Sequence, residues 1–111
     1  MAEENFKVGW LVVLFDLPVG TPAQRSAATR FRLDLLKDGF QMIQFSVYAR
    51  PCVSWSRVQT HSRRLRRLVP PEGSVMALFV TRAQWERAYL IRGKPARAAK
   101  PPGFPTQMLL W

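Results

Sequence analysis

The sequence has few of the residues that stabilise small secreted domains or bind structural metals. Its 111 residues include one cysteine, Cys52, and one histidine, His61. A single thiol forms no disulfide within the chain, and one cysteine with one histidine supplies too few ligands for a structural zinc site. The longest apolar run is far below the ~18 residues of a membrane-spanning helix, and the acidic start MAEEN is unlike a signal peptide. We therefore expect one cytoplasmic domain that does not enter a membrane.

Acidic residues are scarce as well. The chain has 17 Lys and Arg against 7 Asp and Glu, which gives a formal net charge of +10. Between Asp38 and Glu72 it has six arginines and no acid. A basic domain of this size usually binds a polyanion, and a cluster of one sign favours contacts with phosphates over a merely solvated face. The candidate nucleic-acid-binding residues are Arg57, Arg63, Arg64, Arg66 and Arg67, with Arg82 and Arg87 as weaker candidates.

The most informative stretch is an uninterrupted apolar run that starts at Trp10 and ends in Asp16, with Pro18 soon after. Such a run, ended by a turn signal, predicts a buried central strand over about residues 8–17. Side chains alternate along a strand, so Asp16 shares a face with large apolar groups, Trp10 among them. An acid at the carboxyl end of a central strand is either a functional group or a cap for the following loop. Its position alone favours neither.

Local signals predict a helix and then two strands. Thr21 and Gln24 form a capping box around a proline that suits the first helical turn, and Gly39 suits a left-handed helix end. Residues 40–50 are long for one strand, so we expect two strands joined by a bend or tight hairpin near residues 44–46. Both faces of this segment are largely apolar, which predicts that both are covered.

A second helix follows. Pro51 and Cys52 are expected to leave the sheet, and Ser54 to cap a helix that ends before Pro70. The predicted buried stripe of this helix is Trp55, Val58, Leu65 and Leu68, and its outer face holds His61 with the arginines.

The last third predicts a strand and then a tail. Residues 74–81 form the strand, followed by a turn and a short strand at 88–91. Residues 93–107 are rich in Pro, Gly and basic residues, which is typical of a linker. The candidate partner-binding tail is Met108, Leu109, Leu110 and Trp111. An apolar tail after a linker seeks a groove or a sheet edge, or packs on its own domain.

The element order strand, helix, strand, strand, helix, strand predicts an α+β, ferredoxin-like βαββαβ domain over residues 1–92. Residues 93–111 would add the linker, the tail and an extra C-terminal strand. Two helices cover one face of such a sheet, and the other face stays apolar. We therefore expect a homodimer that packs sheet face against sheet face and brings two copies of Asp16 toward each other.

Three segments resemble the Cas2 family of CRISPR-associated proteins. These are LFDLP at residues 14–18, LLKDGF at 35–40 and above all QFSVY at 44–48. The resemblance spans nearly the whole chain, including the apolar end. The chain is most similar to the members encoded beside the single-protein effectors of type II systems. The family is the smaller of the two core proteins of spacer acquisition.

The resemblance implies a homodimer of ferredoxin-like subunits that assembles with the larger CRISPR integrase. The integrase supplies the cutting and joining chemistry, and the small dimer bridges integrase dimers and holds double-stranded DNA over its basic surface. Some members of the family are described as metal-dependent nucleases that use the first-strand aspartate. Asp16 matches that position, as a candidate catalytic residue and Mg²⁺ ligand, and Ser46 matches the family's serine.

The chemistry of the residues favours a scaffold over a strong catalyst. Mg²⁺ takes oxygen ligands, and one aspartate supplies few of them, although a dimer could pair two. His61 has a pKa suited to a general base, but its arginine neighbours favour contact with phosphate or solvent. The leading hypothesis is a DNA-binding scaffold, and the alternative is a Mg²⁺-dependent endonuclease or endoribonuclease centred on paired Asp16. A single-stranded RNA-binding module shares the element order but requires an aromatic strand motif that the sequence lacks.

Overall fold

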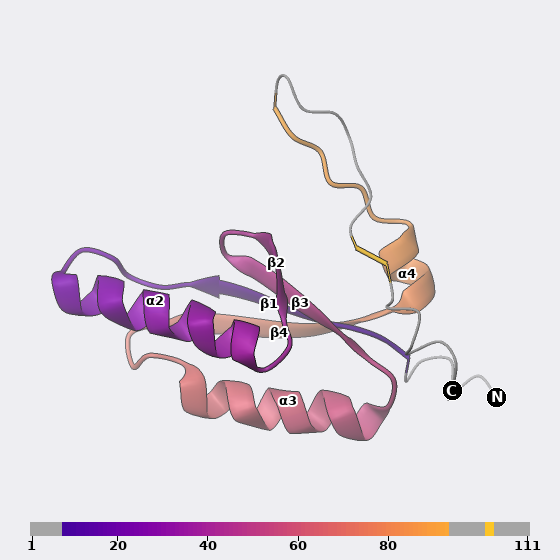
Figure 1. Cartoon of the computed structure of the whole chain (residues 1–111), viewed down its shortest axis with the longest axis horizontal. Coiled ribbons are helices and arrows are strands. Elements are labelled where there is room, and N and C mark those ends of the chain that lie inside the picture. Colours follow the sequence, from indigo (N-terminus) through magenta and orange to yellow (C-terminus); the bar gives the residue numbers. More distant parts are fainter. Residues whose placement is uncertain (1–7, 94–101, 104–111) are drawn as a thin grey trace.

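The computed structural model describes residues 8–93 and 102–103 (Figure 1). Its elements are β1 (Gly9–Asp16), α2 (Pro22–Lys37), β2 (Gln41–Gln44), β3 (Val47–Cys52), α3 (Trp55–Leu68), β4 (Ser74–Thr81) and α4 (Arg82–Glu86). This is the predicted βαββαβ order, with one short helix, α4, added after the last strand. The predicted C-terminal strand and the apolar tail, residues 108–111, lie outside the described residues.

β1 is a central strand of a four-stranded antiparallel sheet with the order β2-β3-β1-β4. It pairs with β4 along its whole length, and from Gly9 to Leu14 it also pairs with β3. α2 and α3 lie together against one face of the sheet (Figure 1). This two-layer arrangement confirms the ferredoxin-like fold that the element order predicts. Within the described part of the chain, no helix has the length and apolar character to cross a membrane.

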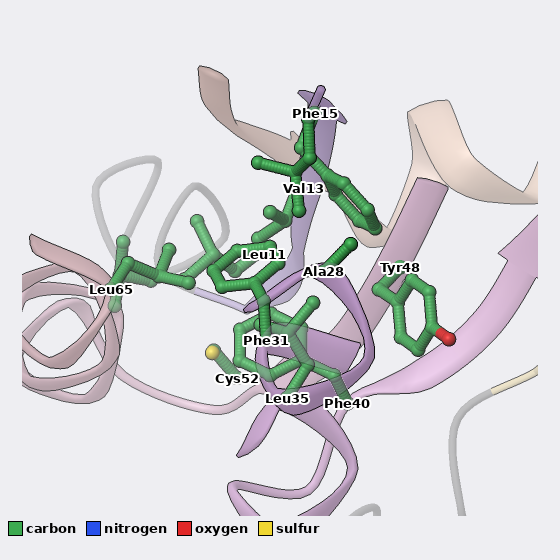
Figure 2. Close-up of a cluster of buried hydrophobic side chains, with 12 residues drawn as sticks. Leu11, Val13, Phe15, Ala28, Phe31, Leu35, Phe40, Tyr48, Cys52 and Leu65 are labelled. Atoms are coloured by element: carbon green, nitrogen blue, oxygen red, sulfur yellow. The ribbon is translucent and has the colours of Figure 1, made fainter. Parts of the chain in front are cut away.

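Alternate side chains of β1 serve opposite layers. Leu11, Val13 and Phe15 lie in the main core between the sheet and the helices (Figure 2). There they join Phe31 of α2 and Leu65 of α3, and the Phe15 and Phe31 rings meet edge to face with centroids 5.0 Å apart. Each large apolar side chain buried in this way stabilises the fold by roughly 1.5–3 kcal/mol, so this layer fixes both helices on the sheet.

The opposite face of the sheet is only partly covered. Trp10 and Val12 are buried there in a second cluster. Farther along the same face, Leu14, Met76 and Leu78 are 36%, 64% and 50% exposed. The structure therefore has the open apolar face that the sequence predicts.

α2 begins and ends at the predicted residues. The Thr21 hydroxyl accepts a hydrogen bond from the Gln24 backbone N–H at 3.1 Å, and the Gln24 side chain accepts one from the Thr21 N–H at 3.0 Å. Gly39 has φ +89°, and a Cβ atom there would lie 2.6 Å from Nη1 of Arg50. The left-handed backbone favours glycine, and a larger side chain would also have to displace the Arg50 guanidinium.

The predicted hairpin forms, with its turn at residues 45–46 between β2 and β3. The prediction that Pro51 and Cys52 leave the sheet is wrong, because both belong to β3 and pair with β1. β2 pairs with β3 only as far as Ala49. Pro51 therefore lies beyond the end of that partner, where the N–H that proline lacks costs no ladder hydrogen bond.

α3 begins after its predicted cap, Ser54, and buries Val58 and Leu65 as predicted. Two other placements on this helix are wrong. Trp55 is 46% exposed rather than buried, and His61 is 3% exposed rather than on the outer face. His61 follows Val58 by three residues and precedes Leu65 by four, so it belongs to their buried stripe by helical geometry.

The predicted short strand at residues 88–91 is also wrong. Residue 90 alone in that segment makes an isolated bridge, and the helix α4 forms before it, directly after β4. The Thr81 hydroxyl accepts a hydrogen bond from the Gln84 N–H, and the Gln84 side chain accepts one from the Thr81 N–H. This capping box is the local signal that starts α4.

A stacked pair of indoles attaches α4 to the open face of the sheet. The rings of Trp85 and Trp10 lie nearly parallel, with centroids 4.4 Å apart, and both residues are buried. Nε1 of Trp85 donates a hydrogen bond to the carbonyl oxygen of Pro102 at 2.5 Å. A helix this short is unstable alone, so the stack accounts for its presence.

Candidate nucleic-acid interface

α3 presents the main basic surface of the domain. The buried stripe through Val58 and Leu65 holds one side of the helix against the sheet. The opposite side consequently faces outward, and the five arginines predicted as phosphate contacts are all exposed. They are Arg57, Arg63, Arg64, Arg66 and Arg67. The structure thus brings these five together on one helix.

The five arginines are not equivalent. Nη1 of Arg64 lies 2.5 Å from Oδ1 of Asp38, and this ion pair leaves the Arg64 side chain about half exposed (51%). Arg63 donates a hydrogen bond to the hydroxyl of Thr60 at 3.4 Å. Among residues 8–93 and 102–103, Arg57, Arg66 and Arg67 form no ion pair with an acid. Four of the five arginines therefore form no ion pair with a carboxylate within that part of the chain.

Asp38 joins the end of α2 to α3. Its Oδ2 lies 2.7 Å from Nδ1 of His61, and its Oδ1 accepts from Arg64. Its backbone carbonyl oxygen accepts a hydrogen bond from Arg50 of β3. One residue thus links two helices and a strand, and its charge is balanced by Arg64. No local sequence signal reveals this role, because His61 and Arg64 are 23 and 26 residues away.

His61 is enclosed between the helices. Burial lowers the pKa of its imidazole, and although the hydrogen bond to Asp38 raises it, the nearby charges of Arg50 and Arg64 lower it further. A neutral His61 with its proton on Nδ1 can still donate to the carboxylate, and the Phe40 ring packs edge-on beside it. His61 therefore positions Asp38 inside the domain, and its burial is unsuited to the contact with phosphate or solvent expected from the sequence.

The weaker candidates lie elsewhere. Arg82 and Arg87 belong to α4 and its end, and α4 packs on Trp10, which faces away from α3. Nε of Arg82 also pairs with Oε1 of Glu86 at 3.6 Å. The structure therefore does not join these two arginines to the α3 group.

One basic residue near the hairpin is not among the predicted nucleic-acid-binding residues. Arg32 of α2 stacks its guanidinium on the Phe45 ring at 3.6 Å from the centroid and donates from Nε to the Phe45 carbonyl oxygen at 3.0 Å. Its charge is committed to holding the hairpin turn rather than left for a ligand.

The candidate catalytic groups do not form a constellation within the chain. Asp16 is exposed at the end of β1, next to Ser74 of β4 in the sheet register. Ser46 lies in the hairpin turn, where its carbonyl oxygen accepts from the Phe15 N–H at 3.0 Å. Burial raises the pKa of the Cys52 thiol, which keeps it protonated.

The described residues of one chain contain no cluster of several metal-ligating side chains. Across residues 8–93 and 102–103, no three His, Cys, Asp or Glu side chains gather into a group that could hold a metal ion. Asp16 alone offers one carboxylate, and Mg²⁺ is usually held by one or two carboxylates together with further oxygen ligands. A magnesium ion held at Asp16 would therefore complete its coordination with further oxygen ligands, water among them.

A family model described as CRISPR associated protein Cas2 matches residues 9–88, from β1 through α4. The chain belongs to the Cas2 family. Two relatives are named CRISPR-associated endoribonuclease Cas2. The one from Parvibaculum lavamentivorans is 45% identical over 85 residues, which cover 77% of this chain and 84% of the relative. The one from Paracidovorax avenae is 45% identical over 96 residues, which cover 86% of this chain and 89% of the relative.

A solved Cas2 structure has the same fold. The crystal structure of Streptococcus pyogenes Cas2 at pH 6.5 superposes with a TM-score of 0.58, at 23% identity, over 76% of this chain and 99% of that chain. At this identity the likeness speaks for the architecture alone. The sequence relatives and the arrangement of the elements thus both indicate the fold of the Cas2 family.

The buried histidine generates a pH prediction. Because the pKa of His61 is lowered in the folded state, the unfolded chain binds a proton near pH 6.5 that the folded chain binds only at lower pH. The free energy of unfolding of the wild type should therefore fall as the pH drops below about 6.5. His61→Asn keeps a donor toward Asp38 but removes this titration. Urea unfolding at several pH values between 5 and 8 should show a flatter dependence in the variant.

His61 is the only histidine of the chain, so no other imidazole complicates that range. Identical pH slopes for wild type and variant would show that burial of this ring is not linked to its protonation.

Proposed function

We propose that this protein is the dimeric DNA-binding scaffold of CRISPR spacer acquisition, which bridges dimers of the larger integrase. The observation that carries the proposal is the group of α3 arginines without carboxylate partners in the described chain. Such a group matches the phosphates of a DNA duplex, since each contact releases counterions and none reads a base. Membership of the Cas2 family supports the same reading.

The open apolar face supports the dimer. Leu14, Met76 and Leu78 lie side by side in the β1–β4 register on the face away from α2 and α3. Exposed apolar surface on a sheet favours association, and a twofold axis lets the same patch serve both subunits. In this arrangement the α3 helices face outward on both sides of the pair. Each subunit then presents its own α3 arginines to DNA.

A charge placed on this face tests the dimer. Met76→Asp would bury an unpaired carboxylate from each subunit, so we expect the dimer to dissociate at least ~100-fold more readily. Leu33→Asp is a matched control, because Leu33 is 47% exposed on α2, in the other layer. Sedimentation equilibrium measures both. A wild-type protein that stays monomeric at micromolar concentration would contradict the proposed dimer.

Two neighbouring arginines test the DNA contact. Arg67→Gln removes a charge that forms no ion pair in the described chain, so the salt dependence of duplex binding should weaken by about one unit in the log–log slope. Arg64→Gln should change the slope less, because Arg64 is already held by Asp38. The measurement is the affinity for a blunt duplex at several salt concentrations. Equal slopes for Arg67→Gln and wild type would exclude Arg67 as a phosphate contact.

A second function, a Mg²⁺-dependent nuclease, is favoured by the endoribonuclease names of the relatives. In a sheet-to-sheet dimer, the exposed Asp16 of each subunit lies on the shared face. Two carboxylates could then hold one Mg²⁺, which would supply a Lewis acid beside a phosphodiester. We favour the scaffold because the described residue paired with Asp16 in the sheet is Ser74 of β4, which is not a general base.

Asp16→Asn separates the two functions. For the scaffold, the variant co-purifies with the integrase and supports integration at the wild-type rate. For the nuclease, RNA or DNA cleavage in the presence of Mg²⁺ drops by at least ~100-fold, as expected for loss of a catalytic group. Asp34→Asn on α2 is the control for a simple change of charge. Loss of integration by Asp16→Asn with intact assembly and DNA binding would support catalysis over the scaffold.

A further inference from the structure

The carboxylate of Asp38 is shared by a buried ring and a surface cation. Its Oδ2 lies 2.7 Å from Nδ1 of His61, and its Oδ1 lies 2.5 Å from Nη1 of Arg64. The His61 side chain is 4% exposed, whereas the Arg64 side chain is 51% exposed. One negative charge therefore serves a ring that stays inside the domain and a guanidinium that can turn outward. While His61 is neutral, Arg64 is the cation that balances this charge.

A cleft beside Asp38 gives the Arg64 side chain a second position. It has a volume of about 380 Å³ and is lined by residues from the C-terminal parts of α2 and α3, namely Asp34, Lys37, Asp38, Arg64, Arg67 and Leu68. Within the described part of the chain, Lys37 and Arg67 form no ion pair with an acid. A DNA phosphate at these two cations would lie in the cleft that Arg64 also lines. The Arg64 side chain can therefore exchange the carboxylate for a phosphate while α3 stays in place.

This exchange leaves a buried carboxylate without its cation. The Asp38 side chain is 11% exposed, and an unpaired charge in such surroundings is strongly unfavourable. Of the other described groups around it, Arg50 of β3 donates to the Asp38 backbone carbonyl oxygen rather than to the carboxylate. Burial raises the pKa of the Cys52 thiol, which keeps that group neutral. His61 is the neighbour that can supply the missing charge, by taking up a proton.

We propose that Arg64 is a proton-gated phosphate contact: protonation of His61 releases Arg64 from Asp38, and a DNA phosphate that binds Arg64 draws a proton onto His61. The inference rests on the proposed DNA-binding function and adds a pH dependence to it. The proton comes from solvent and binds Nε2, while Nδ1 keeps its hydrogen toward the carboxylate. Because such coupling is reciprocal, the complex with DNA holds more protons than its free components. The affinity for DNA should therefore rise as the pH falls.

The electrostatics of the ring have the same sign. In the free protein, burial is the main cause that lowers the pKa of His61, the hydrogen bond to Asp38 raises it, and the charges of Arg50 and Arg64 lower it further. When Arg64 leaves for a phosphate, one of these lowering charges moves away and the hydrogen-bonded carboxylate remains. The pKa of His61 is then higher in the complex than in the free protein. Uptake of one proton changes the affinity by at most ~10-fold per pH unit.

Duplex binding at two pH values tests the gate. For the full-length wild type, the log–log slope of affinity against salt should be about one unit steeper at pH 5.5 than at pH 7.0, because Arg64 becomes an additional phosphate contact. Arg64→Gln and His61→Asn should each show the same slope at both pH values. Asp38→Asn, which frees Arg64 permanently, should have the steeper slope already at pH 7.0. The measurement is fluorescence anisotropy with a labelled blunt duplex.

Asp34→Asn is the matched control, because Asp34 is the other carboxylate among the residues that line the cleft. It removes the same charge without releasing Arg64, so its slope should still differ between the two pH values. Isothermal titration calorimetry at pH 6.0, in buffers of different ionisation enthalpy, counts the protons directly. We expect proton uptake on DNA binding by the wild type and none by His61→Asn. Circular dichroism checks that each variant is folded at both pH values.

The outcomes separate the gate from the proposed function. A wild type that binds no duplex at either pH would contradict the DNA-binding function itself. Duplex binding with equal slopes at both pH values, or with a pH difference that persists in Arg64→Gln or His61→Asn, would overturn the gate alone. A folded Asp38→Asn variant that matches the wild type at pH 7.0 would do the same. If Asp38→Asn does not fold, the other two variants decide the question.

Discussion

The fold depends on the pairing of β1 along both of its edges. Antiparallel neighbours on each side hold this strand in one register, so its side chains alternate without freedom to exchange faces. Leu11, Val13 and Phe15 are committed to the helix layer, and Trp10 and Leu14 to the other side. A slip by one residue would place Asp16 in the core. Both the outward orientation of α3 and the open apolar face follow from this one constraint.

Much of this architecture could be predicted from the sequence because its signals are local. The capping box at Thr21 and the glycine at position 39 mark the ends of α2 within a few residues of chain. The apolar runs of β1 and β4 are strong enough to identify the strands. Ferredoxin-like topology then follows from the order of the elements alone.

The errors arise where a distant partner overrides the local pattern. His61 looks polar enough for the surface, but Asp38, 23 residues earlier, satisfies its ring inside the domain. The β-prone residues 88–91 form no strand, and residue 90 alone makes an isolated bridge. Directly before them, Trp10 offers a surface on which Trp85 stacks, and the short helix α4 forms there. For the interface, the positions of the arginines in the sequence predict that five of them lie on α3. Only the structure shows that Arg64 is paired, because its partner belongs to another element.

The hydrogen bond from Trp85 to the Pro102 carbonyl has a consequence for reach. It attaches the chain to α4 at Pro102, nine residues beyond position 93. A fully extended chain covers at most about 3.6 Å per residue. From Pro102 to position 111 the chain can extend at most about 32 Å, half of the roughly 65 Å that it could extend from position 93. With this hydrogen bond in place, any contact that the last residue makes must lie within that distance of Pro102.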